Sequence, residues 1–266
     1  MTRVAIVIVS FNARDDLART LASLIEAPPT TSHEIVVVDN ASTDGAPALA
    51  RERFPTVRVI DAGGNLGFAR ASNIGIQATA SEFVLLLNPD TVVPAGAIDV
   101  LVARITSAPD VSAIGPRLVD REGRAELSFG TMYSPWSEAR RKAALALDAR
   151  GVRLMRRWIA GATRRERAVD WVSGACLLVR RVAGEAVGWL DERYFMYAED
   201  VDFCAALRKG GGRVLFSPVV EIVHVRGGSR RTNPGPALDA WRASHLAFYR
   251  KHLPHWAGLL EWYLKR

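Results

Sequence analysis

The chain has 266 residues, 49% of them hydrophobic and 24% charged, so it can bury one large core or two modest ones. Its two cysteines, Cys176 and Cys204, lie in apolar or helical surroundings, which argues against a disulfide framework or a metal knuckle and favours a reducing compartment. No apolar run approaches the ~20 residues that a transmembrane helix needs, and the first predicted strand leaves no room for a signal peptide. We therefore expect a soluble, cytoplasmic protein.

The net charge of +7 is concentrated in one segment, residues 136–168, which holds ten basic and three acidic residues. This basic block points to an anionic partner such as a phosphorylated lipid, a membrane surface or nucleic acid. The alternative is a solvated helical face. Nucleic acid is the least favoured partner because the segment has too few aromatic residues to stack on bases.

Strand and helix patterns alternate through the first third of the chain. Apolar runs predict strands at residues 4–9, 34–38, 57–60 and 82–87, and apolar residues at helical spacing predict helices at 14–25, 46–53 and 69–80. This order is typical of a doubly wound α/β protein, with a single, mostly parallel sheet flanked by helices.

The strand at residues 82–87 is followed by Asn88-Pro89-Asp90. Five consecutive apolar residues indicate a strand buried on both faces, and ligands of open α/β sheets bind beyond the carboxyl ends of such strands. Asp90 is either a turn former or a metal ligand. Mg²⁺ commonly uses only one or two carboxylates together with substrate phosphates, so one aspartate at a strand tip suffices for a metal site.

The first two strands end in polar residues, Ser10 and Asn12 in one case and Asp39 and Asn40 in the other. No glycine follows the first strand and no Gly-Lys-Ser/Thr loop occurs, which argues against a nicotinamide enzyme or a P-loop nucleotidase. The polar groups could instead read the edge of a base. A carboxylate accepting from a ring N–H suits uracil or thymine, although Asp39 could also be a plain turn residue.

A glycine-rich stretch at residues 63–75 opens the predicted third helix. Its glycines permit unusual backbone angles, and the N-terminus of the helix is a natural place for a diphosphate. Asn73 lies in an apolar helical pattern, so it needs a hydrogen-bond partner if it is buried.

A second group of acidic residues, Glu199, Asp200 and Asp202, stands at the start of a helix predicted to run to residue 209. One acid would suffice to cap that helix, so three suggest chemistry. Upstream, Gly174 and Ala175 interrupt an apolar pattern and leave room beside a strand for a sugar. Trp171 is either a core residue or a platform on which a sugar stacks.

Two segments have a less definite prediction. The basic block at residues 136–168 reads as an amphipathic helix or a mobile loop. Residues 230–266 read as a helical tail that follows a main domain at 1–229. Its tryptophans and tyrosine suit either an interfacial membrane surface or packing against the main domain.

Four motifs occur in a familiar order: Ser10-Phe11-Asn12, then 37–45 (Val-Val-Asp-Asn-Ala-Ser-Thr-Asp-Gly), 65–73 (Asn-Leu-Gly-Phe-Ala-Arg-Ala-Ser-Asn) and 85–90 (Leu-Leu-Leu-Asn-Pro-Asp). Together they resemble family 2 glycosyltransferases of the GT-A fold, and the rhamnosyltransferase-like branch is most similar. The resemblance covers roughly residues 4–229. It implies inverting transfer of a sugar from a nucleoside diphosphate with bound Mg²⁺ or Mn²⁺. Asn88 stands where the family has the first aspartate of its Asp-x-Asp motif, so Asp90 is the one carboxylate there.

The resemblance also implies a role for individual residues. Asp200 is the expected general base, and Glu199 is expected to orient the acceptor or Asp200. Asp90 and His224 are the candidate metal ligands, His224 alternatively being a structural hydrogen-bonding residue. The candidate donor-binding residues are Ser10, Asn12, Asp39, Asn40, Asn65, Gly67, Phe68, Asn73, Asn88 and Arg230. The candidate acceptor- or sugar-binding residues are Trp171, Gly174 and Ala175.

The predicted function is transfer of a sugar to a hydroxyl of a glycan or a polyprenyl-linked acceptor of the cell envelope. The expected donor is dTDP-L-rhamnose, with a UDP-hexose as the alternative. The enzyme would act in the cytoplasm, peripherally at the inner face of the cell membrane. A noncatalytic protein that binds nucleotide sugars or anionic surfaces is the alternative from another class.

Overall fold

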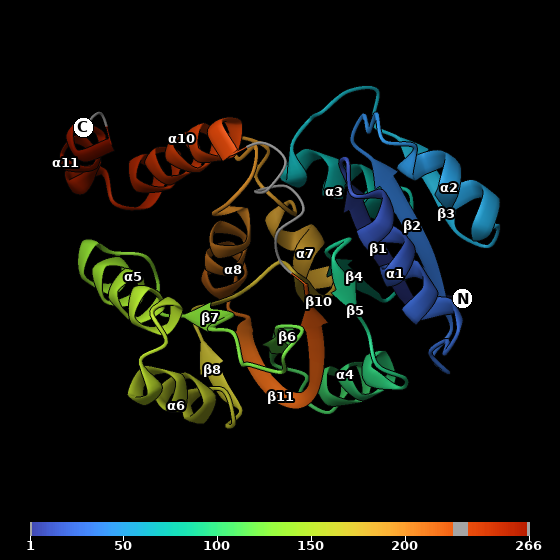
Figure 1. The fold of residues 1–266 in the computed structure, drawn as a ribbon, viewed down its shortest axis with the longest axis horizontal. Helices are drawn as coiled ribbons and strands as arrows, with labels where there is room; N and C mark the ends of the chain where they lie inside the picture. The colour runs from blue at the N-terminus through green and yellow to red at the C-terminus, as the bar shows by residue number, and fades with distance from the viewer. Residues whose placement is uncertain (1, 226–233, 265–266) are drawn as a thin grey trace.

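The structure is a computed structural model that describes residues 2–225 and 234–264 (Figure 1). A central sheet has the strand order β3-β2-β1-β4-β10-β6-β11-β5, and β8 pairs with β11. The strands are β1 (Val4–Ser10), β2 (His33–Asp39), β3 (Arg58–Asp61), β4 (Phe83–Leu87), β5 (Thr91–Val92), β6 (Val111–Val119), β8 (Arg167–Val169), β10 (Cys176–Arg180) and β11 (Arg213–His224). A separate small sheet pairs β7 (Phe129–Gly130) with β9 (Trp171–Val172).

The sheet is mixed, as predicted. Strands β1 to β4 run parallel to one another, β10 runs antiparallel to both β4 and β6, and β11 runs parallel to β6. The long strands therefore share one direction across the sheet. Their carboxyl ends meet at one edge.

Alternating side chains of the central strands form two cores, because successive side chains of a strand point to opposite faces. Ile6 and Ile8 pack with the helices of one face, whereas Val7 packs with those of the other. The helices of the first face are α1 (Arg14–Ile25), α2 (Ala46–Arg53) and α4 (Ala97–Thr106). Those of the second face are α3 (Phe68–Gln77), α7 (Arg181–Val187), α8 (Glu199–Lys209) and α10 (Pro234–His252).

The basic block forms two helices, α5 (Pro135–Ala149) and α6 (Arg153–Ala162). Ser134 caps the first of them through a reciprocal pair of hydrogen bonds with Ser137. Of the two predictions for this segment, the helix is confirmed and the mobile loop is wrong. Beyond it, the strand predicted through residues 169–179 is split into β9 and β10. The break falls at Gly174, whose backbone N–H bonds to the Asp200 carboxylate instead of a neighbouring strand.

The C-terminal segment is helical, as predicted, and consists of α10 and α11 (Pro254–Leu264). Phe248 and Tyr249 of α10 are buried in the second core, so this helix packs against the main domain. Helix α11 has no buried residue. The predicted boundary between residues 229 and 230 lies outside the described residues.

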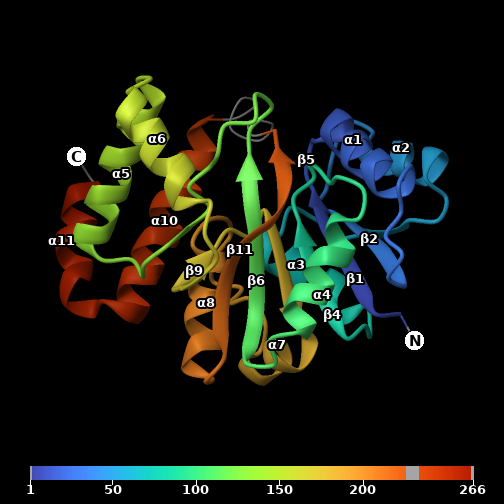
Figure 2. The ribbon, with the colours of Figure 1, turned by 90° about the horizontal axis from the view of Figure 1, so that it is seen from below.

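Figure 2 shows how the helices are distributed around the sheet, with α1 and α2 at one end and α5, α6, α10 and α11 at the other. The carboxyl ends of the parallel strands open between these two groups. Within residues 2–225 and 234–264, no helix has the length and apolarity needed to cross a membrane.

Candidate active site

The tips of β1 and β2 carry two buried polar side chains side by side. Ser10 pairs with Asp39 in the parallel register, and their side chains are 0% and 5% exposed. The Asp39 carboxylate accepts a hydrogen bond from the N–H of Ser42, but its Oδ1 atom and the Oγ of Ser10 have no partner in the structure. Buried polar atoms without partners are costly unless a ligand satisfies them, so this pair is suited to reading the edge of a base.

Asn40 ties the glycine-rich loop to the tip of β2. Its amide donates to Asn65 Oδ1 at 2.9 Å and accepts from the N–H of Leu66 at 2.8 Å. On the neighbouring tip, Asn12 has a left-handed backbone (φ 48°), and its side-chain oxygen accepts from the N–H of Thr43 at 2.8 Å. These three asparagines therefore shape the walls of the predicted donor site.

Gly67 brings the start of α3 against the segment that precedes α8. Its φ is 82°, and a Cβ atom there would lie 2.3 Å from the carbonyl oxygen of Phe195. The next residue, Phe68, donates its N–H to that carbonyl at 2.6 Å. Only glycine fits at this contact, because both the backbone angle and the space forbid a side chain.

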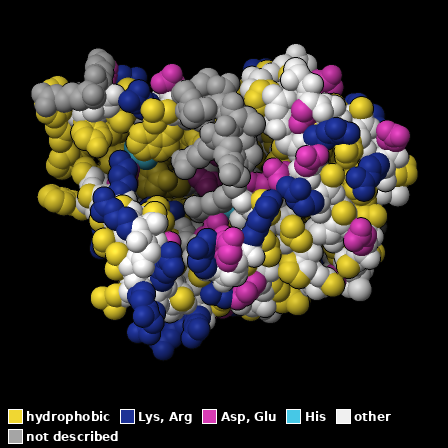
Figure 3. All heavy atoms as spheres, in the orientation of Figure 1, with side chains coloured by type: hydrophobic (Ala, Val, Ile, Leu, Met, Phe, Trp, Pro, Cys, Tyr) yellow, Lys and Arg dark blue, Asp and Glu magenta, His cyan; other side chains and the backbone are white. Residues whose placement is uncertain are grey.

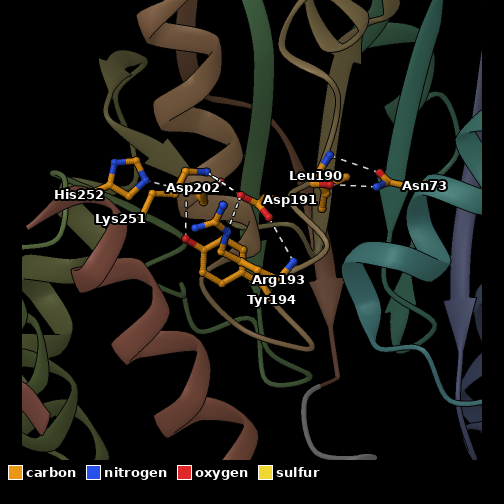
Figure 4. Close-up of polar contacts among 8 residues, drawn as sticks. All are labelled: Asn73, Leu190, Asp191, Arg193, Tyr194, Asp202, Lys251 and His252. Atoms are coloured by element: carbon orange, nitrogen blue, oxygen red, sulfur yellow. Dashed lines mark hydrogen bonds and ion pairs between the residues drawn. The ribbon is translucent and has the colours of Figure 1, made fainter. Parts of the chain in front are cut away.

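Asn73 is buried (6% exposed) and braces the loop after α7. Its amide donates to the carbonyl of Leu190 at 2.9 Å and accepts from the N–H of the same residue at 3.2 Å (Figure 4). It also donates to the carboxylate of Glu192 at 3.1 Å. The predicted need for a partner is met inside the protein. The assignment of Asn73 to the donor site is therefore corrected to a structural role.

The two candidate acidic residues converge on one corner of the sheet. The N–H of Asn88 donates to the carbonyl of Ala175 at 3.0 Å, which fixes the chain two residues before Asp90. The adjacent Gly174 donates its N–H to Asp200 Oδ2 at 2.9 Å. Asp90 and Asp200, 110 positions apart in sequence, are thus linked by two neighbouring residues at the tip of β4.

Gly174, predicted to leave room for a sugar, lies against Asp200 and Phe68. A Cβ atom there would come within 3.4 Å of Asp200 Cβ and 3.8 Å of the Phe68 ring. The donor loop, the strand break and the candidate base therefore meet at a single glycine. Ala175 is buried (3% exposed), so it contributes its backbone to this corner.

Asp90 lies against His224, the last residue of β11. Their Oδ1 and Nε2 atoms are 3.3 Å apart, and the other ring nitrogen, Nδ1, is 3.1 Å from Glu126 Oε2. Burial lowers the pKa of His224, but the hydrogen bonds to Asp90 and Glu126 outweigh it and raise the pKa to about 9. The imidazole therefore lies between two carboxylates that favour its protonated form.

This pair fits a divalent cation in part. The 3.3 Å separation is close to the ~3 Å between adjacent ligand atoms around Mg²⁺. Glu126 would then hold the His224 ring from behind, as carboxylates do for metal-bound histidines. In the described part of the chain, no group of three or more His, Cys, Asp or Glu side chains is arranged to hold a metal. Substrate phosphates would have to complete the coordination, as is common for Mg²⁺.

Glu199, which is buried, and Asp200, which is half-buried, form an acidic pair. Burial, and for Glu199 also the neighbouring Asp200, raises the pKa of both carboxyl groups. The N–H groups of Gly174 and Val201 hold Asp200, whereas Glu199 Oε2 has no hydrogen-bond partner among residues 2–225 and 234–264. The pKa of Glu199 is raised to about 8, and the raised pKa of Asp200 makes its carboxylate a stronger proton acceptor, as a general base requires.

The backbone that leads into this pair is strained. Tyr197 and Ala198 both have left-handed conformations, with φ values of 74° and 65°. Alanine and tyrosine rarely adopt them, and each costs of order 1 kcal/mol or more. Strain of this kind concentrates at functional sites, and here it sets the direction in which Glu199 and Asp200 leave the loop.

Two residues of this site were missed by the sequence analysis. Arg141 of α5 donates to the carbonyl of Leu127 at 2.7 Å, and its charge lowers the pKa of Asp200 against the effect of burial. Tyr133 is also close enough for the Asp200 charge to raise its pKa, after the larger effect of burial. No motif marked either residue, because Arg141 belongs to the basic block and Tyr133 lies just before it.

Trp171 does not form a stacking platform. Its side chain is 3% exposed, and its ring N–H donates to the carbonyl of Thr131 at 2.9 Å. The Arg141 guanidinium lies 4.7 Å from its ring centroid, and Tyr133 meets it edge-on. The stacking interpretation is therefore wrong, and Trp171 is a core residue that supports Arg141.

Asp202, the third acid of the motif, is structural. It is 2% exposed and accepts from Tyr194 Oη at 3.1 Å, Lys251 Nζ at 2.8 Å and His252 Nε2 at 2.6 Å (Figure 4). Lys251 also reaches Asp191 at 2.8 Å. The end of α10 is thereby fixed to the first turn of α8, which carries Asp200.

Figure 3 shows a hollow in this face of the molecule, with acidic side chains inside it and basic ones along the edge formed by α5 and α6. A cavity of about 390 Å³ lies between α5, α6 and the segment after β6. Glu126, Leu127, Arg156 and Ile159 are among its lining residues. Because Glu126 contacts His224, the cavity adjoins the Asp90–His224 pair, the candidate metal site. Arg230, a predicted donor residue, lies outside the described residues.

Comparison with known proteins identifies the family. The sequence pattern of the family described as Glycosyl transferase family 2 matches residues 5–183. The N-acetylglucosaminyl-diphospho-decaprenol L-rhamnosyltransferase of Mycobacterium tuberculosis (strain ATCC 25618 / H37Rv) is 32% identical over 98% of this chain and 88% of its own length. The low-salt glycan biosynthesis hexosyltransferase Agl10 of Haloferax volcanii is 28% identical over 83% of this chain and 66% of its own length.

Solved structures agree on the fold. The mannosyltransferase PcManGT from Pyrobaculum calidifontis, solved in complex with GDP-Man and Mn²⁺, has a TM-score of 0.66 at 20% identity, covering 98% of this chain and 69% of its own. Staphylococcus aureus TarS (residues 1–349) has a TM-score of 0.60 at 14% identity over 93% of this chain and 65% of its own. By sequence and by fold, this chain belongs to glycosyltransferase family 2 and has the GT-A fold.

Proposed function

We propose that this protein transfers L-rhamnose, with inversion, from dTDP-L-rhamnose to a hydroxyl of a glycan carried on a polyprenyl diphosphate. The similarity to the mycobacterial rhamnosyltransferase over nearly the whole chain supports the sugar and the class of acceptor. The observation that carries the proposal is the Asn88–Ala175 and Gly174–Asp200 contact pair, which joins a strand tip suited to a diphosphate with a half-buried carboxylate suited to a base.

Asp200 is the proposed general base. It takes the proton from the acceptor hydroxyl while that oxygen forms a bond to the anomeric carbon of rhamnose. The bond from this carbon to the diphosphate oxygen breaks on the opposite side, and the nucleoside diphosphate leaves. One base and no covalent nucleophile are enough for an inverting displacement. The pKa of Asp200, raised by burial, strengthens it as a base.

Asp90 and His224 are the proposed ligands of Mg²⁺ or Mn²⁺. When bound there with the donor, the ion would supply positive charge against the charge that grows on the leaving diphosphate. Ser10 and Asp39 are the proposed contacts to the nucleobase of the donor. Each has a buried polar atom without a hydrogen-bond partner among the described residues. Asp39 would accept from the ring N–H that thymine and uracil share.

The test is a transfer assay with the full chain, Mg²⁺ and a short-chain lipid diphosphate that carries N-acetylglucosamine. We expect the acceptor to gain one deoxyhexose from dTDP-L-rhamnose, with an anomeric configuration opposite to that of the donor. If sugar is transferred from UDP-hexoses but not from dTDP-L-rhamnose, the donor is a UDP-hexose and the proposed donor is wrong. Tight donor binding without transfer to any acceptor would favour the noncatalytic alternative.

The proposed acceptor lies in a membrane, so the enzyme would work peripherally at the inner face of the cell membrane. This location fits a catalytic domain that needs to reach only the headgroup region. Co-sedimentation of the protein with membranes, reversed by high salt, is the corresponding observation.

A further inference from the structure

Helix α6 exposes an apolar face that packs against nothing in the described structure. Ile159 is 2% exposed and points into the protein, whereas Leu154 and Trp158, one turn apart, are 78% and 54% exposed. Arg153 and Arg157, both exposed, border these two side chains along the helix. An exposed leucine alone is unremarkable, but an apolar stripe beside a row of arginines is typical of helices that lie in a membrane interface.

Helix α11 also carries large apolar side chains that are more than half exposed. Leu259, Trp262 and Tyr263 are 56%, 52% and 59% exposed, and Trp256 shares their side of the helix. Tryptophan and tyrosine are the residues that favour the headgroup region of a bilayer. On α5, Lys142 Nζ lies 5.9 Å from the Tyr263 ring centroid, so a positive charge accompanies the aromatic side chains here as well.

The two helices that carry these side chains lie on the same side of the molecule. Figures 1 and 2, which differ by a quarter turn, both place α5, α6 and α11 along one lateral edge. Residues 136–168 of this edge carry a net charge of +7, equal to that of the whole chain. A second copy of the protein would oppose like charges across a symmetric contact, whereas an anionic lipid surface complements them.

We propose that Leu154, Trp158, Arg153 and Arg157 of α6, together with Leu259, Trp262 and Tyr263 of α11, form a lipid-facing surface that binds anionic phospholipid bilayers. The evidence for the surface comes from these two helices alone. Its purpose, bringing a lipid-linked acceptor to the active site, rests on the proposed function.

The position of α6 supports that purpose. Arg156 and Ile159, on its inner side, line the 390 Å³ cavity that also contains Glu126. Glu126 is the residue that contacts His224 at the candidate metal site. One helix therefore has its outer side on the lipid-facing surface and its inner side on a cavity next to the active site. A sugar attached to a headgroup diphosphate would have a short path between them.

The test is co-sedimentation of the full chain with vesicles of phosphatidylcholine alone or of phosphatidylcholine mixed with phosphatidylglycerol. We expect binding to the anionic vesicles that weakens as salt rises, because screening acts on headgroup attraction. The double variants Leu154→Ser/Trp158→Ser and Arg153→Glu/Arg157→Glu should each lose about tenfold or more in vesicle affinity. Circular dichroism and thermal melts establish that both variants are folded.

Matched controls lie on other helices. Val182→Ser on α7 removes an apolar side chain that is 73% exposed, and Arg51→Glu/Arg53→Glu on α2 reverses two exposed charges. Both should bind vesicles like the unmodified protein. If the controls lose as much affinity as the surface variants, or if the surface variants lose none, the proposal is overturned.

Two further readouts separate the alternatives. Light scattering gives the oligomeric state of the unmodified protein and of Leu154→Ser/Trp158→Ser. A dimer that becomes a monomer in this variant would show that a second copy covers the surface, which contradicts the proposal. With a water-soluble acceptor analogue, the surface variants should transfer at the unmodified rate. If no variant and no unmodified protein transfers any sugar while vesicle binding changes as expected, the proposed function fails and the lipid-facing surface stands.

Discussion

Asp200 accepts hydrogen bonds from two backbone N–H groups, those of Gly174 and Val201. Replacing it with asparagine keeps the shape and removes the proton acceptor. We expect Asp200→Asn to lower the turnover number by about 10²–10⁴-fold, the usual contribution of a general base, while donor affinity changes little. Asp110→Asn, at the opposite end of β6, is the control. A variant with full turnover would rule out Asp200 as the base.

Glu199 makes the fold less stable as the pH rises. Its folded-state pKa is raised by burial and by Asp200, so folding takes up a proton at every pH above the ordinary value of 4.5 and below the raised one. Glu199→Gln removes that cost. We expect a melting temperature about 3–6 °C above that of the unmodified protein at pH 8, and a difference that vanishes near pH 4.5. Equal melting curves at pH 8 would contradict the assignment.

Arg141 sets where Asp200 titrates. Its charge lowers the pKa that burial raises, so its removal should raise that pKa further. Activity requires the deprotonated base and is lost as the pH falls through this pKa. We therefore expect Arg141→Gln to move the acid limb of the turnover–pH profile to higher pH. The exposed neighbour Arg140, replaced in the same way, should leave the limb in place; a shift of equal size there would refute the local effect.

For single residues, the sequence is most informative at the ends of helices and strands that have a clear apolar pattern. Asp90 and Asp200 could be proposed from the sequence because one follows a fully apolar strand and the other lies in the first turn of a helix. Glu126 and Arg141 were not found, because each becomes part of the site only through tertiary contacts, Glu126 with a histidine 98 positions away. Trp171 was ambiguous because a core aromatic and a sugar platform have the same sequence pattern.

At the scale of elements, α10 holds α8 in place. The buried Asp202 on α8 receives a hydrogen bond from Lys251 on α10, and Lys251→Met would leave this carboxylate with less compensation. We expect a loss of about 1–3 kcal/mol in the free energy of unfolding, measured by urea titration.

Lys209→Met, at the exposed end of α8, is the matched control and should cost well under 1 kcal/mol. In Lys251→Met, the turnover number should fall more than the affinity for the donor. The reason is that α8 carries Asp200 but none of the residues predicted to contact the nucleobase. Stability equal to that of the control would show that α10 does not hold α8.

Several element boundaries agreed with their predictions, including α1 at Arg14–Ile25, because its apolar residues repeat at helical spacing. The break between β9 and β10 was not predicted. Gly174 and Ala175 interrupt the apolar pattern there, but only the hydrogen bond between Gly174 and Asp200 shows why the strand stops. Helices α5 and α6 were ambiguous because arginines interrupt their apolar period, and Gly151, with a φ of 78°, turns the chain between them.

At the scale of the whole molecule, the mixed sheet decides where the site lies. The apolar runs predicted a sheet, but no local pattern gives the direction of β10, which is antiparallel to both of its neighbours. This strand places Gly174 and Ala175 beside the tip of β4. The corner shared by Asp90 and Asp200 is therefore a product of topology, which short-range sequence patterns do not contain.

The most direct test of the candidate metal site is a crystal structure with Mn²⁺ and dTDP, in which anomalous scattering locates the ion. We expect one peak that contacts Asp90 and His224 at about 2.0–2.3 Å and shares a diphosphate oxygen, with the sugar side of the diphosphate facing Asp200. A nucleotide bound with the ion elsewhere, or with its diphosphate turned away from Asp200, would contradict a single active-site corner built from these two aspartates.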